Sequence, residues 1–399
     1  MARSERFNSQ SGGRSSTGNL KAILLATALV LSAGAFIILS DTEGSDASAA
    51  GPNLEWKVEG DTLIISGYGD MTYPGSLLPY IWFINDKQTV KHIVLKEGIT
   101  SLAKGCFKFP NLTGEIVIPK SLKSIGNNVF EGTGITSIVF PEGSQLESIG
   151  SWAFRNCKEL TGTLNLPDSL TYIGQDAFEG CSKLTGNVKI PVGMNYVNGG
   201  VFVGCASLSG NININPNVWF IAQNAFDGCT KITGKLELTH KVGLGVWDYA
   251  FRGCIGLTDV VISHCLSGIG EGAFEGCTGL KTVMLNDGRI GSRAFAGCVN
   301  LTELAIGSKI TEITPDAFEG LSFYDEDGNE LLLSKETQKE FIGYIFEGSN
   351  GKLTRTGATG DIIPDADEGN GIDLGLIALP IVFIVGLVAG LFIAKIRKP

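Results

Sequence analysis

The decapeptide AFEGCSKLTG at residues 177–186 is one copy of a phrase that returns along the chain. AFRNCKELTG at 153–162 and AFDGCTKITG at 225–234 keep the same Phe and the same Cys three residues later. Phenylalanines in this anchoring position recur every 21 to 25 residues: Phe107, Phe130, Phe154, Phe178, Phe202, Phe226, Phe251, Phe274, Phe295 and Phe318. A period this regular predicts a solenoid, in which each coil packs only on its neighbours.

One unit, LTGTLNLPDSLTYIGQDAFEGC at 160–181, contains two short apolar segments. Leu164 and Leu166 alternate with polar residues, which is the period of a strand with one buried face. A Pro ends that strand, and Leu170 and Ile173 supply a second buried segment before the Phe turn. We therefore expect β-rich coils without a helix of ordinary length.

The pattern LxLPxSLxxIGxxAFxGCxxL resembles the BspA-like leucine-rich repeats of microbial cell-surface proteins. LEWKVEGDTLIISGYGDM at 54–71 looks like the N-terminal cap of that family, and FYDEDGNELL at 323–332 is similar to hairpins that close such arrays. The resemblance covers roughly residues 54–353. It implies a curved parallel-β solenoid of about ten coils, displayed on a surface, with binding roles and no catalytic site.

Two apolar runs frame this array. Residues 22–40 and 374–394 carry no charge, and the second run is long enough at about 1.5 Å per residue to cross a hydrocarbon core of about 30 Å. Its basic flank KIRKP places the C-terminus in the cytoplasm. The first run is either a signal peptide, cleaved near Ala49, or an uncleaved membrane anchor. Both alternatives put the solenoid on the extracellular side of a cell membrane.

These features give a complete division of the chain. The segments are a basic cytoplasmic n-region (1–21), a signal peptide or N-terminal membrane anchor (22–40), a linker (41–52), an N-terminal cap (53–90), the leucine-rich repeat solenoid (91–320), a C-terminal cap (321–353), an acidic flexible stalk (354–373), a transmembrane helix (374–394) and a cytoplasmic tail (395–399).

Small residues repeat at intervals of four within the second apolar run. Gly386, Gly390 and Ala394 form a face on which two membrane helices pack closely, which predicts a homodimer. The alternative is that they reflect the general abundance of Gly in membrane helices.

Charge and motifs argue against several function classes. The net charge is −10, from 41 acidic and 31 basic residues, so nucleic acid is not an expected partner. Only three histidines occur, no nucleophile, zinc-protease or phosphate-loop motif is present, and we expect neither catalysis nor a cofactor.

Two weak metal patterns remain as alternatives. His240 lies nearly one repeat before His264 and Cys265, so the three side chains would meet on adjacent coils. The carboxylates and amide of Asp325, Asp327, Asn329 and Glu336 occupy calcium-loop positions, but Glu330 stands where a Gly is needed, so a hairpin turn is favoured.

Seven cysteines share the position three residues after the anchoring Phe. They are Cys157, Cys181, Cys205, Cys229, Cys254, Cys277 and Cys298. Stacked coils would align them in one column, but parallel side chains hold Cβ atoms farther apart than a disulfide requires. We interpret them as small buried core residues, with a disulfide ladder or a metal site as the alternatives. Asn111 and Asn300 begin glycosylation sequons whose occupancy stays open.

Two outward columns of the central coils are candidate binding residues. On the first strand, the residue between the buried apolars is polar in four successive coils: Asn165, Lys189, Asn213 and Glu237. The alternative to a binding patch is a solvated sheet face with asparagine ladders.

The second column is aromatic. Six residues before the anchoring Phe stand Tyr172, Tyr196 and Phe220, and Trp219 adjoins the last of these. Exposed aromatic side chains offer large contact area at low entropic cost, although a self-stacking ladder would explain them equally well.

These residues together predict a membrane-anchored extracellular leucine-rich repeat protein that mediates adhesion or recognition. Its partner would be a protein or a glycan on another surface. The alternative is a structural envelope or spacer protein that acts by lateral assembly.

Overall fold

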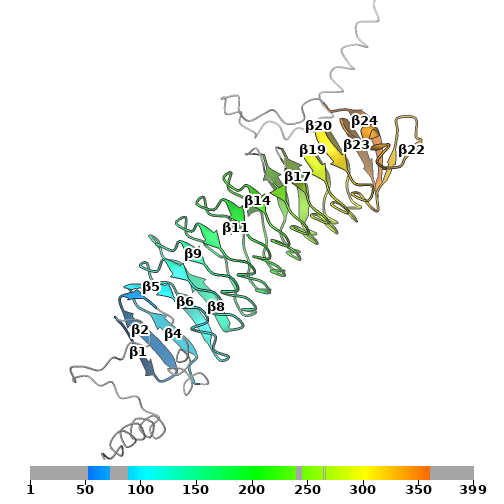
Figure 1. Ribbon diagram of the computed structural model, residues 1–399. Coiled ribbons are helices and arrows are strands. Elements are labelled where there is room, and N and C mark those ends of the chain that lie inside the picture. Colours follow the sequence, from blue (N-terminus) through cyan, green and yellow to red (C-terminus); the bar gives the residue numbers. More distant parts are fainter. Residues whose placement is uncertain (1–52, 72–88, 240–244, 264, 266, 360–399) are drawn as a thin grey trace, which may run out of the picture.

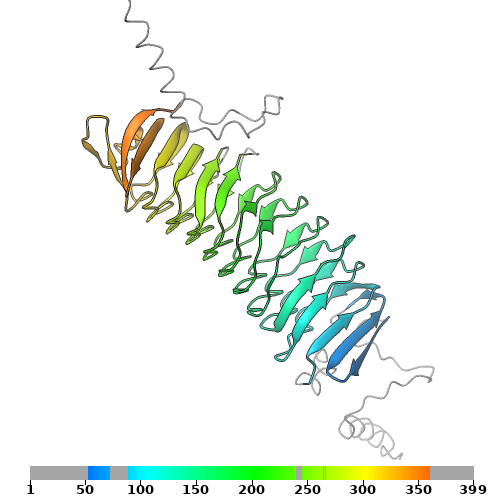
Figure 2. The same cartoon turned by 180° about the vertical axis from the view of Figure 1, so that it is seen from behind.

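The computed structural model describes residues 53–71, 89–239, 245–263, 265 and 267–359 as one elongated array of coils. The coils follow one another in chain order between two caps, as both views show (Figure 1, Figure 2). The predicted solenoid of leucine-rich repeats is therefore confirmed. The expectations for residues 1–52, for the apolar run at 374–394 with Gly386, Gly390 and Ala394, and for residues 395–399 lie outside the described residues.

Each regular coil contributes two short strands. The first strands are β4 (His92–Leu95), β6 (Thr113–Val117), β8 (Gly134–Val139), β11 (Val188–Lys189), β13 (Ile212–Asn213), β15 (Gly234–Leu238) and β17 (Leu257–Ile262). The second strands are β5 (Ile99–Leu102), β7 (Ser124–Ile125), β9 (Ser148–Ile149), β10 (Tyr172–Ile173), β12 (Tyr196–Val197), β14 (Phe220–Ile221), β16 (Gly245–Val246) and β18 (Gly268–Ile269). Most strands of neighbouring coils pair in parallel, but β4 does not pair with β6, β10 does not pair with β12, and β13 does not pair with β15. β19 (Thr282–Ile290) and β20 (Glu303–Ile313) are long enough to span both positions.

The caps cover the two open ends of the core. At the N-terminal end, β1 (Leu54–Glu59) and β2 (Thr62–Gly67) form an antiparallel hairpin, and β2 pairs in parallel with β4; β3 (Gly69–Asp70) pairs with β5. At the C-terminal end lie β21 (Ser322–Tyr324), β22 (Glu330–Leu331), the 3₁₀ helix η2 (Gln338–Glu340), β23 (Tyr344–Ser349) and β24 (Lys352–Ala358). Antiparallel β23 ends the parallel sheet by pairing with β20.

The C-terminal cap is longer than the sequence predicts. We expected the flexible stalk to begin at residue 354, but β24 continues to Ala358 and pairs with β23. The reason is Arg355, whose guanidinium lies over the Tyr344 ring and pairs with Glu326 at 2.7 Å and Glu340 at 3.4 Å. A polar strand held by ion pairs lacks the apolar alternation that marks a strand in a sequence.

The anchoring phenylalanines form one stack along the core. Consecutive rings from Phe107 to Phe318 have centroid separations of 5.1 to 5.7 Å, and each side chain is at most 3% exposed. Each ring therefore packs between the rings of the two neighbouring coils.

The cysteines form a second, parallel column. The thiol of each of the seven donates a hydrogen bond to the carbonyl oxygen of the anchoring Phe in the preceding coil, at 3.1 to 3.3 Å. All nine cysteines of the chain are free thiols. In the coil of Phe130 the same position holds Thr133, whose hydroxyl donates to the Phe130 carbonyl and lies 3.5 Å from the Cys157 sulfur. From the coil of Phe130 to the coil of Phe295 the position thus holds a small side chain that donates a hydrogen bond, whereas Pro110 and Leu321 occupy it in the first and last coils.

The residue after the anchoring Phe carries a charge in most coils, and the signs alternate. These charges form ion pairs between adjacent coils, with N–O distances of 2.9, 2.7 and 2.5 Å: Lys108–Glu131, Arg155–Glu179 and Asp227–Arg252. Exposed pairs stabilise a fold by only about 0.2–1 kcal/mol each, so the pattern mainly specifies which coil follows which.

Within the described part of the chain, no helix has the length and apolar character needed to cross a membrane.

Replacing Phe202 with Ala should lower the free energy of unfolding by about 3–5 kcal/mol, because the cavity opens onto the Phe178 and Phe226 rings on either side. Chemical denaturation monitored by circular dichroism measures this loss. The matched control is Val203→Ala, the next residue, which is only partly buried and should cost less than about 1 kcal/mol. Equal effects of the two substitutions would contradict the central role of the stack.

Alkaline pH should unfold the protein. Burial raises the pKa of Cys205 and Cys298 from 9.0 to about 12, and it raises the pKa of Cys229, Cys254 and Cys277 well above 9.0. The unfolded chain loses these protons above about pH 9 while the folded chain keeps them. Stability is therefore fully present below pH 9 and falls as pH rises toward 12, by up to about 1.4 kcal/mol per pH unit for each thiol.

Midpoints of chemical denaturation, measured from pH 8 to pH 11, test this decrease in stability with pH. Cys205→Thr, which copies Thr133, removes one titrating group and should make the slope shallower. A midpoint that stays constant across this range would show that the thiols are not buried.

Candidate functional site

The parallel sheet of first strands is interrupted in the middle of the array. β8 pairs only with β6, and β11 pairs only with β13. The strand expected in the intervening coil is absent, because residues 163–166 make a single bridge, from Thr163 to Thr185. The Leu166 N–H donates instead to the Leu164 carbonyl at 3.0 Å, a tight three-residue turn that removes it from the sheet.

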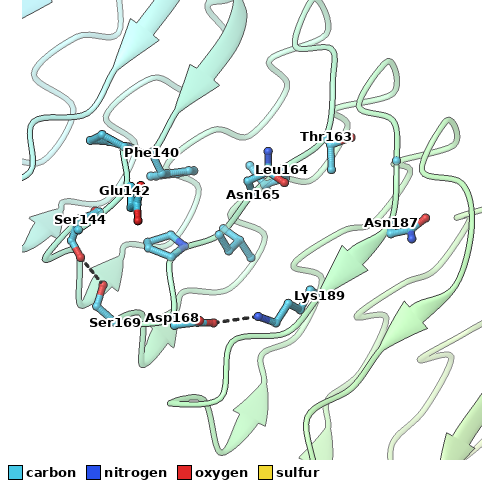
Figure 3. Close-up of a pocket in the computed structure, with 15 residues that line it drawn as sticks. Phe140, Glu142, Ser144, Thr163, Leu164, Asn165, Asp168, Ser169, Asn187 and Lys189 are labelled. Atoms are coloured by element: carbon cyan, nitrogen blue, oxygen red, sulfur yellow. Dashed lines mark hydrogen bonds and ion pairs between the residues drawn. The ribbon is translucent and has the colours of Figure 1, made fainter.

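This interruption leaves an open hollow of about 860 Å³ (Figure 3). Its walls come from three successive coils, through residues 140–144, 163–169 and 186–189. Phe140 and Leu166 pack against the core but stay only partly buried, because no strand covers them. The hollow therefore offers apolar contact at its base.

Polar and charged groups lie around the same hollow. The Lys189 ammonium lies 3.1 Å from the Asp168 carboxylate, and the Ser169 hydroxyl donates to the Ser144 carbonyl at 3.0 Å (Figure 3). Both members of the Lys189–Asp168 pair are more than half exposed, so water screens their attraction and they can exchange partners. A few polar groups around an apolar base are typical of ligand sites.

The structure brings together only part of the predicted polar column. Asn165 and Lys189 line the hollow, with Thr163 and Asn187 beside them. Asn213 is exposed on β13, and Glu237 pairs with Lys235 at 3.3 Å; both lie outside the hollow. Phe140, Glu142 and Asp168 do not stand out in the sequence, because each looks like an ordinary member of its repeat.

Asparagines of this face stack on glycines of the next coil. A Cβ atom on Gly210 would lie 2.0 Å from the Asn187 Oδ1 atom, and one on Gly234 would lie 2.3 Å from Asn211 Oδ1. Both glycines have positive φ angles, of 79° and 80°, which a larger residue adopts only with strain. These close contacts leave no room for a side chain at either glycine, and they place Asn187 of the hollow against the next coil. The asparagine ladder considered from the sequence stays a prediction.

The aromatic column forms a stack that the sequence analysis predicted only in part. The rings of Tyr196 and Phe220 stack at 5.1 Å, and Phe220 stacks on Trp247 at 5.0 Å. Trp247 was missed because it lies two residues after the column position, which is Gly245. A Cβ atom on Gly245 would lie 3.2 Å from the indole nitrogen, so the indole fills the space that glycine leaves.

The other two aromatic candidates lie apart from this stack. Tyr172 is 37% exposed on β10, which belongs to a different sheet from β12. Trp219 is 59% exposed. Stacking uses the ring faces of Tyr196 and Phe220 for each other, so their edges and the end faces of the stack are what a ligand would contact.

The candidate calcium loop has a different structure. The Asp325 Oδ1 atom accepts the amide hydrogens of Asp327 at 3.0 Å and Asn329 at 2.7 Å, within the turn between β21 and β22. A further hydrogen bond from the Asn329 side chain holds the pKa of Asp325 below its usual range. These oxygens stabilise the hairpin turn. Glu336 instead accepts a hydrogen bond from Ser334.

The structure shows little about the second metal pattern, formed by two histidines and a cysteine, or about the two glycosylation sequons. His240 and His264 lie outside the described residues, and Cys265 is buried. The described segments contain no group of three or more metal-ligating side chains. Asn111 and Asn300 are both exposed, and the Asn300 amide donates to the Thr278 carbonyl at 2.8 Å.

The repeat pattern matches a family described as the BspA type leucine-rich repeat region, in six copies over residues 100–233 and 245–329. The chain belongs to this family. The resemblance in the repeat motif is thus confirmed. BspA-type repeats occur in bacterial cell-surface proteins, and leucine-rich repeat solenoids of this kind are typically non-enzymatic.

Several solved structures are similar to the chain at low sequence identity. A leucine-rich cell surface protein from Faecalibacterium prausnitzii is 20% identical, with a TM-score of 0.34 over 72% of this chain and 89% of that one. A leucine-rich repeat protein from Bacteroides ovatus is 20% identical, with a TM-score of 0.41 over 68% and 93%. The pneumococcal vaccine antigen PcpA is 18% identical, with a TM-score of 0.37 over 67% and 74%. No curated protein matches the sequence.

Replacing Phe220 with Leu removes the middle ring of the aromatic stack. We expect a loss of about 1–2 kcal/mol in unfolding free energy, since two ring contacts disappear, together with a red shift in the fluorescence of Trp247 as its indole becomes exposed. Tyr172→Leu is the control outside the stack and should change stability by less than about 0.5 kcal/mol. If both variants lose the same stability, the stack contributes nothing specific.

Proposed function

We propose that the protein is a membrane-anchored recognition protein whose solenoid is displayed outside the cell and binds a protein or glycan on another surface. It makes no covalent bond with its ligand. Membership of the BspA-type family supports surface display, and the two uncharged apolar runs with their basic flanks support an anchor with a cytoplasmic C-terminus.

The observation that carries this proposal is the hollow between β8 and β11. Phe140 and Leu166 form a partly exposed apolar base, while the exposed Lys189 and Asp168 side chains stand beside it. Burying the apolar base on binding would contribute about 25 cal/mol per Å². The lysine and the aspartate would select a ligand that presents complementary charges.

A second candidate function is lateral assembly into an envelope layer. The outward column of the first three coils consists of Val94, Val117 and Val139, which are 36%, 49% and 38% exposed. A row of exposed valines on neighbouring strands favours contact with another apolar surface. Sedimentation of Val117→Lys beside the unchanged chain tests this function, because a charge in the row would prevent assembly.

The recognition proposal is tested by reversing charge in the hollow. We expect the double substitution Lys189→Glu with Asn165→Arg to reduce capture of the physiological partner at least about tenfold, since it places two carboxylates together and crowds the base. The full chain, immobilised from detergent, is incubated with extracts of cell surfaces, and the bound proteins and glycans are quantified by mass spectrometry.

Lys158→Glu is the matched control. Lys158 is an exposed lysine of a neighbouring turn and does not line the hollow. Any fragment used instead of the full chain must extend to residue 359, because β24 completes the cap. Identical partners and amounts for the double variant and the unchanged chain would refute the hollow as the recognition site.

A further inference from the structure

A second hollow, of about 270 Å³, lies at the end of the aromatic stack. It is separate from the hollow between β8 and β11 and shares no lining residue with it. Three successive coils line it, through Trp247 and Asp248, then Gly268 and Gly270, and then Arg289.

The hollow exists because the aromatic column is interrupted by a glycine. Gly268 has a φ angle of 82°, and a Cβ atom there would lie 3.0 Å from the Arg289 carbonyl oxygen. Both facts favour glycine at this position, so the column has no side chain in this coil. No further ring follows Trp247 in the stack among the described residues, and the hollow lies beside Gly268.

Trp247 presents an aromatic face to this space. Its indole stacks on Phe220 with an interplanar angle of 11°, so one face is covered by the preceding coil and the opposite face is directed toward the coil of Gly268. The side chain is 48% exposed and lines the hollow. The stack holds the indole in place before any ligand arrives, which lowers the entropic cost of binding.

Polar groups with spare hydrogen-bonding capacity surround the same space. Asp248 accepts the Glu271 amide hydrogen through Oδ1 at 2.8 Å, and its Oδ2 atom has no partner among the described residues. Arg289 pairs with Glu312 through Nε at 2.9 Å, so its guanidinium is held beside the hollow. The exposed amide of Gln223 completes the lining.

We propose that this hollow binds a neutral pyranose ring, a single sugar unit of a glycan. The C–H groups on one face of a pyranose suit the negative face of the Trp247 indole. Hydroxyls on adjacent carbons both donate and accept, which matches the free oxygen of Asp248 and the N–H groups of Arg289 and Gln223. A volume of about 270 Å³ holds one ring in contact with the indole.

The mixed charge of the lining favours a neutral occupant over a charged one. A cationic side chain would be attracted by Asp248 but repelled by Arg289, and an anionic group would be attracted by Arg289 but repelled by Asp248. A phenyl ring would stack on the indole but would cover the polar atoms opposite without replacing their hydrogen bonds to water. An uncharged ring that carries hydroxyl groups satisfies both sides.

Saturation-transfer NMR with the full chain tests this assignment, in a detergent without a sugar headgroup. The probes are the methyl pyranosides of glucose, galactose, mannose and N-acetylglucosamine, with mannitol as an acyclic polyol that lacks a ring face. We expect at least one pyranoside to bind with a Kd of roughly 1–10 mM, the range for so small a ligand in an open hollow. Mannitol should give no signal.

Three substitutions locate the binding. Trp247→Ala should weaken it at least about tenfold, Trp247→Phe should keep part of it, and Asp248→Asn should weaken it while retaining the hydrogen bond from Glu271. Trp219→Ala, which removes an exposed tryptophan outside the hollow, should leave the affinity unchanged. Thermal unfolding of each variant confirms that the fold is intact.

The proposal is overturned if no pyranoside gives saturation transfer above mannitol, or if Trp247→Ala and Trp247→Phe both bind as well as the unchanged chain. Binding of a capped phenylalanine or arginine peptide at Trp247 in place of the sugars would also overturn it. The Lys189→Glu, Asn165→Arg variant should bind pyranosides normally, so failure at one hollow is distinguishable from failure at the other.

Discussion

The fold depends on a contact that repeats from coil to coil: an aromatic ring stacks on the ring before it, and a thiol beside it donates to the carbonyl of the preceding coil. The ring separation of 5.1 to 5.7 Å sets the rise of the array, and the thiol–carbonyl bond fixes how each coil is turned relative to the last. Both groups are buried, so water does not compete for the ring contact or for the hydrogen bond. The short strands and the aromatic column of successive coils are then aligned, because each coil takes its position from the same two contacts.

Because the core carries the stability, the outer surface can lose regularity at little cost, and both hollows lie where the repeat fails. One forms where Leu164 and Leu166 close a tight turn instead of joining a sheet, and the other forms where Gly268 interrupts a column of rings. Regular coils have the same outer surface as their neighbours, so no regular coil has a shape that a ligand could distinguish. A defect is therefore what gives one part of such a surface a distinct shape.

The repeated core was predictable from the sequence, because a Phe and a Cys at fixed separation leave a periodic trace. The deviations were not. Leu-Asn-Leu before a Pro reads as a strand whether or not its amides pair with the next coil, and Trp247 lies outside the column into which its ring folds. Residues 354–358 look like a linker because ion pairs of Arg355 replace apolar contacts. Periodicity reports what is shared among coils, whereas a binding site depends on what differs.

The alternation of charge after the anchoring Phe also constrains how the array can change length over evolutionary time. Loss of the single coil that carries Arg155 would place Glu131 against Glu179, two acids in the position of an ion pair. Loss of that coil together with the next would place Glu131 against the uncharged Val203, so no like charges would meet. A change of two coils at this place therefore avoids the like-charge contact that the loss of one coil would create.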